Sequence, residues 1–113
     1  MNINEVLIRE AKIPMEFQVI EDLWRTSGSG IHLGDSDTIE EIEKKILRDP
    51  DLFLVATFKE QIIGTVLGGF DGRRGMVYHL AVSNVFRNNG IGERLMSDLE
   101  MRFHRKGCIR SYL

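Results

Sequence analysis

The chain has 113 residues, enough for one domain with one hydrophobic core, and we expect a single domain over residues 1–113. The formal net charge of −2 leaves no basic surplus, so nucleic acid is not expected as a partner. The longest apolar runs fall far short of the roughly 20 residues of a membrane span, so no membrane association is expected. The single cysteine, Cys108, cannot form an internal disulfide, and the polar N-terminus is unlike a secretory signal. Together these features predict a cytoplasmic protein.

The first half of the chain predicts a strand followed by two helices. Residues 5–10 alternate weakly between apolar and polar, which suits a strand. Pro14 fits the first turn of a helix, and an apolar stripe follows at helical spacing, formed by Phe17, Ile20, Leu23 and Trp24. After a glycine-rich polar loop, Thr38-x-x-Glu41 has the spacing of a capping box and predicts the start of a second helix. Asp49-Pro50-Asp51 ends that helix.

The second half predicts three strands, a helix and a last strand. The strands span residues 52–58, 61–70 and 76–82, and their short connections imply antiparallel pairing. The helix after Arg87 has one apolar stripe, formed by Ile91, Leu95, Leu99 and Phe103. The strand that begins at Cys108 follows this crossover helix, so it should lie parallel to the strand before it. We therefore predict an α/β fold with a mixed sheet of about five strands and three helices.

The most informative motif is Arg87-x-x-Gly90-x-Gly92, which comes between a predicted strand and a predicted helix. A helix start offers unpaired N–H groups, and glycines let an anion approach the backbone, so the motif predicts a pyrophosphate cradle. A Rossmann fingerprint would follow the first strand and need an acidic residue on a later strand, whereas here the glycines follow four predicted strands. No Gly-Lys-Ser/Thr follows, which excludes a P-loop. Glycines required only for tight helix–sheet packing remain an alternative.

The motif belongs to a longer pattern, Leu80-x-Val82 and then Phe86-Arg87-x-x-Gly90-Ile91-Gly92, with Lys106-Gly107-Cys108 closing the helix. With this pattern the chain resembles the GNAT superfamily of N-acetyltransferases, in its small bacterial type. The resemblance implies that an acetyl group passes from acetyl-CoA to a primary amine of a small molecule or peptide. A non-catalytic CoA-binding or interaction module is the alternative. The chain departs from the family pattern at Asn84, where proline is common, and at Asn88, where glycine is common.

The resemblance also implies the cofactor contacts. In the family, the strand before the helix bulges and its backbone pairs with the pantetheine arm, a role that here falls to Leu80, Ala81 and Val82. The pyrophosphate would be held by the turn amides of Arg87, Asn88, Asn89, Gly90, Ile91 and Gly92. No metal site is expected.

The candidate catalytic residues are Tyr78 and His79, which come just before the expected bulge. An imidazole is suited to accept the proton of the acceptor amine. Strand alternation places Tyr78 and His79 on opposite faces, so only one of them should face the pocket, and the resemblance favours Tyr78. His32 falls in the loop that lines the acceptor site in the family.

GNAT domains usually continue beyond the strand that begins here at Cys108, with a helix and a strand pair. We therefore expect the C-terminal part of the family domain to be absent. An open edge at residues 109–113 would recruit a partner, which predicts a homodimer joined near this strand.

Overall fold

The fold is that of a computed structural model, which describes residues 2–27, 37–108 and 110–112, with side chains as far as Cys108. The sheet has the order β1-β2-β3-β4-β5. Its strands are β1 (Leu7–Glu10), β2 (Phe53–Phe58), β3 (Gln61–Phe70), β4 (Arg74–Val82) and β5 (Arg110–Tyr112). The helices are α1 (Phe17–Thr26), α2 (Ile39–Arg48) and α3 (Ile91–Arg105).

The first four strands pair antiparallel, and β5 pairs parallel with β4 after the crossover through α3. This confirms the predicted mixed sheet and its three helices. One boundary prediction is wrong, because Pro14 lies in a turn and α1 begins only at Phe17. The Phe17 N–H donates to the Pro14 carbonyl oxygen at 3.1 Å, which closes that turn before the helix begins.

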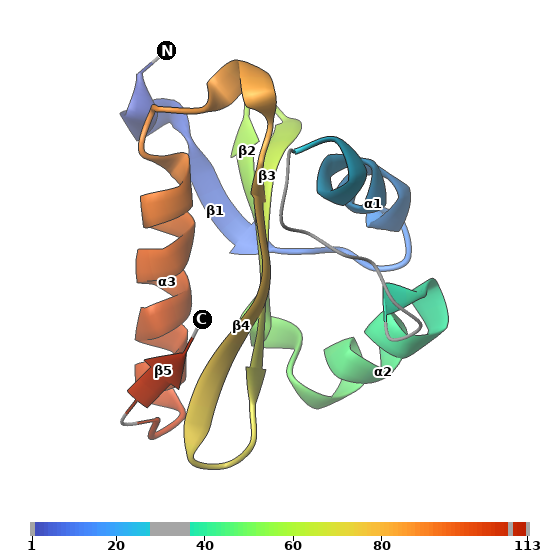
Figure 1. Ribbon diagram of the computed structural model, residues 1–113, viewed down its shortest axis with the longest axis vertical. Coiled ribbons are helices and arrows are strands. Elements are labelled where there is room, and N and C mark those ends of the chain that lie inside the picture. Colours follow the sequence, from blue (N-terminus) through green and yellow to red (C-terminus); the bar gives the residue numbers. More distant parts are fainter. Residues whose placement is uncertain (1, 28–36, 109, 113) are drawn as a thin grey trace.

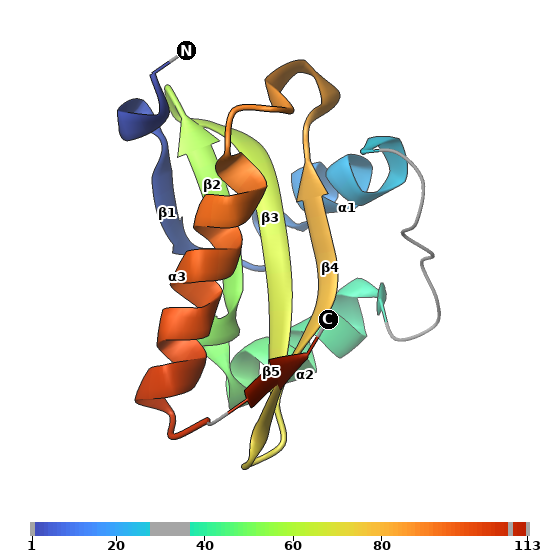
Figure 2. The same ribbon diagram turned by 60° about the vertical axis from the view of Figure 1, so that its left-hand side comes forward.

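The sheet separates two layers of helix, as Figures 1 and 2 show: α3 covers one face, and α1 and α2 cover the other. The core under α3 is closed. Leu95, Leu99 and Phe103 are buried there against apolar side chains of β2 and β3. Gly68 of β3 allows this close approach, because a Cβ at that position would lie 2.8 Å from Leu99 Cδ1.

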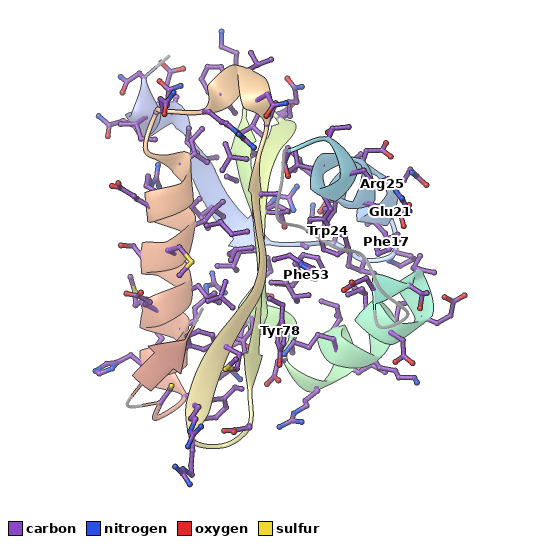
Figure 3. The ribbon with its side chains drawn as sticks, in the orientation of Figure 1. Phe17, Glu21, Trp24, Arg25, Phe53 and Tyr78 are labelled. Carbon is purple, nitrogen blue, oxygen red and sulfur yellow. The ribbon has the colours of Figure 1, made fainter. Side chains whose placement is uncertain are left out.

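The core under α1 is centred on Trp24, which is buried between the helix and the sheet (Figure 3). The Trp24 ring lies parallel to Phe53 of β2, with centroids 6.1 Å apart, and meets Phe17 edge-on. Both rings belong to the same buried cluster as Ile42 of α2. The two short helices are therefore joined to the sheet through one aromatic cluster.

A bulge interrupts β4 on its pairing with β3. Val77 pairs with Gly68 and His79 pairs with Leu67, so Tyr78 is an extra residue on β4. The prediction that Tyr78 and His79 face opposite sides is therefore wrong. The extra residue breaks the alternation, and both side chains line one pocket on the face covered by α2.

Candidate functional site

The turn before α3 is built from backbone in the left-handed region. Asn88 has φ 66° and Gly90, the residue that caps α3, has φ 78°. The Asn89 side chain holds the turn from inside, because its Nδ2 donates to the Phe86 carbonyl at 3.0 Å and to the Arg87 carbonyl at 3.2 Å. A turn of this kind directs successive backbone N–H groups toward the same side.

The first backbone hydrogen bond of α3 runs from Arg94 N–H to the Gly90 carbonyl at 3.1 Å. The N–H groups of Ile91 and Gly92 precede this bond and have no acceptor within the helix. No side chain caps the helix at Gly90. Ile91 is 1% exposed and belongs to the core, so only its backbone is available to a ligand. The helix start thus presents bare donors at the positive end of its dipole.

The outer edge of β4 runs beside this turn, and beyond Met76 it pairs with no other strand of the described residues. Within the described residues, β5 pairs with β4 only over Arg74–Met76. Further along, the Ser83 N–H donates to the Ile63 carbonyl at 2.8 Å, toward β3. Alternate residues of an antiparallel strand direct their backbone groups to opposite sides, so those of Leu80 and Val82 point away from β3. Ala81, paired with Thr65, directs its own groups toward β3.

The open strand edge and the turn are adjacent. A Cβ added to Gly92 would lie 3.9 Å from Val82 Cγ2 and 4.0 Å from Leu80 Cδ2. The end of β4 therefore packs against the start of α3, and the free backbone groups of the two elements are brought together. We call the edge of β4 and the adjoining start of α3 the backbone track. Of the predicted cofactor contacts, Leu80, Val82 and the turn residues lie on this track. The Ala81 side chain is instead buried on the α1 side.

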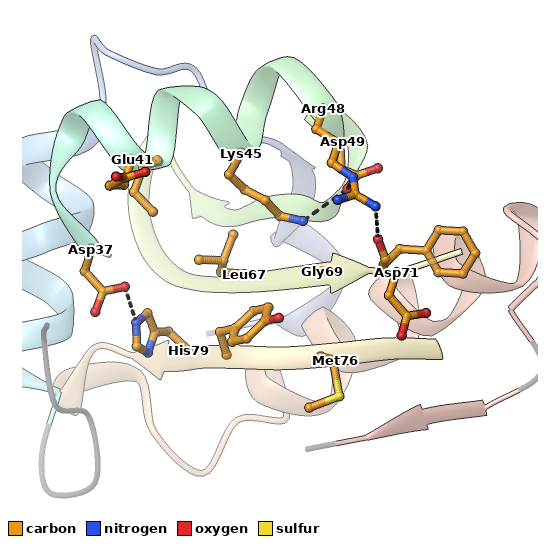
Figure 4. Close-up of a pocket in the computed structure, with 13 residues that line it drawn as sticks. Asp37, Glu41, Lys45, Arg48, Asp49, Leu67, Gly69, Asp71, Met76 and His79 are labelled. Carbon is orange, nitrogen blue, oxygen red and sulfur yellow. Dashed lines mark hydrogen bonds and ion pairs between the residues drawn. The ribbon is translucent and has the colours of Figure 1, made fainter. Parts of the chain in front are cut away.

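A pocket of about 600 Å³ lies on the other face, between α2 and the strands β3 and β4 (Figure 4). Its wall is formed by Asp37, Glu41, Ile42, Lys45, Arg48, Asp49, Leu67, Gly69, Phe70, Asp71, Met76, Tyr78 and His79. The Tyr78 ring lies over Gly69, where a Cβ would come 2.6 Å from Tyr78 Cε2. The bulge and this glycine together give the tyrosine its place in the wall.

His79 is a half-buried polar group of this wall. Its side chain is 12% exposed, and its Nε2 lies 2.8 Å from Asp37 Oδ1 (Figure 4). Its ring packs on Trp24, with centroids 4.9 Å apart. Asp37 directly precedes Thr38, the N-cap of α2, so the start of α2 carries the carboxylate to the histidine.

A charged cluster lies at the opposite end of α2. Asp49 Oδ2 lies 3.3 Å from Lys45 Nζ, and Asp49 Oδ1 lies 3.3 Å from Lys106 Nζ. Burial acts to raise the pKa of Asp49, but the two ammonium groups outweigh it and lower the pKa below its usual range. Burial lowers the pKa of Lys45 despite Asp49. Arg48 Nη2 donates to the Phe70 carbonyl at 2.9 Å, which ties this end of α2 to β3.

Tyr78 and His79, the predicted candidates, line this pocket, whereas no prediction from the sequence included Asp37. The spacing Thr38-x-x-Glu41 drew attention to helix capping, and the Glu41 N–H does donate to Thr38 Oγ1 at 3.4 Å. The available sequence signal for Asp37 was a carboxylate directly before an N-cap. Its partner His79 lies 42 residues later, so local spacing does not predict the contact. His32, the other candidate, lies outside the described residues.

The acetyltransferase (GNAT) family sequence model matches residues 17–113, and the chain belongs to this family. It is 39% identical over 98 residues to an acetyltransferase of Pectobacterium atrosepticum, covering 87% of this chain and 68% of that protein. It is 46% identical over 68 residues to an acetyltransferase of Photorhabdus laumondii, covering 60% of this chain and 48% of that one. The chain thus spans about half to two thirds of the length of these relatives.

Among solved structures, the fold is similar to the PaiA N-acetyltransferase of Thermoplasma acidophilum in complex with coenzyme A. The TM-score is 0.77 at 20% identity, over 91% of this chain and 76% of that one. At this identity the likeness concerns the fold.

No helix within the described residues is both long and apolar enough to cross a membrane.

Proposed function

We propose that this protein transfers an acetyl group from acetyl-CoA to a primary amine. The observation that carries the proposal is the continuous backbone track formed by the uncapped start of α3 and the edge of β4 beyond Met76, where no described strand pairs with it. A pantetheine arm carries amides that pair with a strand edge, and a pyrophosphate is suited to bare helix N–H groups. Acetyl-CoA has both groups in one molecule. A similar fold binds coenzyme A in the Thermoplasma acidophilum protein.

The cofactor would lie along this track. The pyrophosphate takes the N–H groups of the turn from Arg87 to Gly92, and the pantetheine pairs with the backbone groups of Leu80 and Val82. The acetyl thioester then comes to Leu80, just beyond the bulge, where the Leu80 N–H can donate to the thioester oxygen. That donor would stabilise the charge that develops on the oxygen during attack.

The acceptor would occupy the pocket on the opposite face. Tyr78 and His79, the two residues before Leu80, line it, so a bound amine would meet the thioester across the strand. His79 is the base in this proposal, and Tyr78 is the proton donor to the departing thiolate. The pocket wall is mixed in charge, and its volume is that of a small molecule or a few peptide residues.

Replacing Gly90 by valine tests the cradle. The branched side chain would block approach to the neighbouring N–H groups, so we expect acetyl-CoA binding to be lost. Isothermal titration with acetyl-CoA measures this directly. Gly72 provides a matched control, because both glycines have positive φ, 78° and 102°, and neither has an atom within 4 Å of an added Cβ.

Gly72→Val should cost a similar amount of stability, about 1–3 kcal/mol, while acetyl-CoA binding is unchanged.

Release of thiol with a panel of amines then tests the chemistry, using a peptide with a free N-terminus, free lysine and spermidine. Binding without thiol release would indicate a non-catalytic CoA-binding module instead. If Gly90→Val bound acetyl-CoA as well as the parent, the cradle assignment would be wrong.

The predicted dimer and the cytoplasmic location stay predictions. Ile109 and Leu113, which would contribute to the dimer edge, lie outside the described residues. The pairing of β5 with β4 covers Arg74 to Met76 and does not bear on what lies along the far edge of β5.

A further inference from the structure

We propose that Asp37 is a positioning residue that holds His79 in the tautomer able to take the proton from the acceptor amine. The inference deepens the proposed function and rests on it. The contact that supports it joins two elements distant in sequence, the start of α2 and the bulge of β4, at 2.8 Å.

The chemistry of the two groups fixes the direction of this hydrogen bond. An ionised carboxylate can only accept, so His79 Nε2 carries the hydrogen and donates to Asp37 Oδ1. In the neutral ring, Nδ1 then has a free lone pair. Nδ1 is the ring nitrogen nearer the main chain, so the accepting atom lies on the strand side of the ring, close to the bulge.

The surroundings hold this arrangement in place. The two side chains are 12% and 11% exposed, so water competes little for the hydrogen bond. The Trp24 ring lies against the imidazole and limits its rotation. A histidine that is bonded through one nitrogen and packed on an aromatic ring has one orientation toward the pocket.

The proton balance is straightforward. The acceptor enters as an ammonium ion, and Nδ1 of His79 takes one proton from it, directly or through water. The neutral amine attacks the thioester carbon, the C–S bond breaks, and the amine nitrogen loses its second proton as the amide forms. That proton passes to the CoA thiolate, through Tyr78 in the proposed assignment, and the imidazolium returns its proton to solvent. The Asp37 carboxylate stabilises the imidazolium while it exists.

Other titratable or charged side chains also line the pocket, namely Glu41, Lys45, Arg48, Asp49, Asp71 and Tyr78. The acids among them have their own partners. Glu41 lies 3.1 Å from Lys44, Asp49 contacts two ammonium groups, and Asp71 accepts from the Arg73 and Arg74 N–H groups at 2.8 Å. Asp37 is the pocket carboxylate seen in contact with the histidine within the described part of the chain.

The test compares Asp37→Asn with the parent in steady-state kinetics. The side-chain amide of an asparagine can donate to His79 Nε2. The ring hydrogen then lies on Nδ1, which can no longer accept a proton. We expect kcat to fall on the order of 10- to 100-fold, with the KM for acetyl-CoA unchanged, while His79→Gln falls at least as far. Asp37→Glu, which restores the carboxylate, should recover part of the rate.

Asp22→Asn is the matched control, because Asp22 is an exposed helix carboxylate bonded to the neutral Gln18 side chain at 3.0 Å. It removes the same charge far from the pocket and should leave the rate as in the parent. A purely structural role for Asp37 would instead lower the melting temperature and leave kcat of the folded fraction unchanged, which would overturn the inference.

The tautomer itself can be read from the ¹⁵N chemical shifts of the imidazole, assigned by loss of the signal in His79→Gln. This measurement needs no turnover. The inference is supported if the His79 ring hydrogen lies on Nε2 in the parent and on Nδ1 in Asp37→Asn. It is overturned if the hydrogen lies on Nδ1 in the parent. Absence of thiol release by the parent with every amine would count against the proposed function alone.

Discussion

The two faces of the sheet are built differently, and the difference matches the two tasks of the proposed function, cofactor binding and acceptor binding. On one face a single helix of 15 residues, α3, lies over a closed core and has four side chains buried against the strands. On the other face two helices of 10 residues, α1 and α2, leave a pocket between α2 and the strands. The α3 face fixes the turn before α3 with respect to β4, and the α2 face holds the pocket that the proposed function assigns to the acceptor.

Glycines and polar groups are distributed accordingly. On the α3 face, Gly64 and Gly68 let Leu95 and Leu99 approach the backbone of β3 closely. On the α2 face, the wall carries charged side chains that are held by ion pairs and hydrogen bonds. In the proposed function, the support for the cofactor and the polar pocket for the amine thus lie on opposite sides of the same two strands.

The largest effect that separates the two faces should come from the closed core. Leu99→Ala removes a fully buried side chain from tight packing and should cost about 2–5 kcal/mol of unfolding free energy. Ile46→Ala, on the half-buried side of α2, should cost about 1 kcal/mol. Urea unfolding followed by circular dichroism measures both. Equal costs would mean that the α2 face is packed as firmly as the α3 face, and the comparison would fail.

Much of this architecture could be predicted from the sequence, because it depends on local periodicity. The stripe from Ile91 to Phe103 predicted α3 and its buried face, and the short connections predicted antiparallel pairing. The parallel return of β5 was predicted from the crossover helix that joins it to β4. The left-handed backbone at Asn88 and Gly90 also agrees with the residue types at those positions.

The pocket wall could not be predicted in the same way. A bulge adds one residue to a strand without changing its composition, so the alternation that separated Tyr78 from His79 gave no sign of it. The contact between Asp37 and His79 depends on where α2 is placed, which is a tertiary property. The sequence thus predicts the helical stripe over the closed face better than the polar contacts within the open one.

An effect of intermediate size should come from the charged cluster at the end of α2. Asp49→Asn removes the negative charge shared by Lys45 and Lys106, together with one of the two acceptor oxygens, and should cost about 1.5–3 kcal/mol near neutral pH. The pKa of Asp49 is lowered in the folded state, so its contribution is complete above its unfolded pKa of about 3.9. The contribution is lost as the pH falls through the folded pKa, and the two proteins should converge in acid. Urea unfolding at a series of pH values checks this.

Glu41→Gln is the control for that series, because the Glu41–Lys44 pair is exposed and should contribute little. A difference between parent and Asp49→Asn that stayed constant down to strongly acidic pH would show that the cost comes from packing rather than from charge. In that case the pocket wall at the end of α2 would be stabilised mainly by packing, as the core under α3 is.

The smallest effect should come from the cap of α2, and it bears most directly on the independence of the two faces. Thr38 Oγ1 accepts from the Glu41 N–H at the long distance of 3.4 Å, so Thr38→Ala should cost only about 0.5 kcal/mol, or about 2–4 °C in melting temperature. At the start of α3 no side chain occupies the corresponding place, which leaves its amides open to a ligand. Because the two helix starts lie on opposite faces, saturating acetyl-CoA should raise the melting temperature of the parent and of Thr38→Ala by the same increment. A smaller increment in Thr38→Ala would mean that loosening α2 reaches the cofactor track through β4, and the two faces would then act as one site.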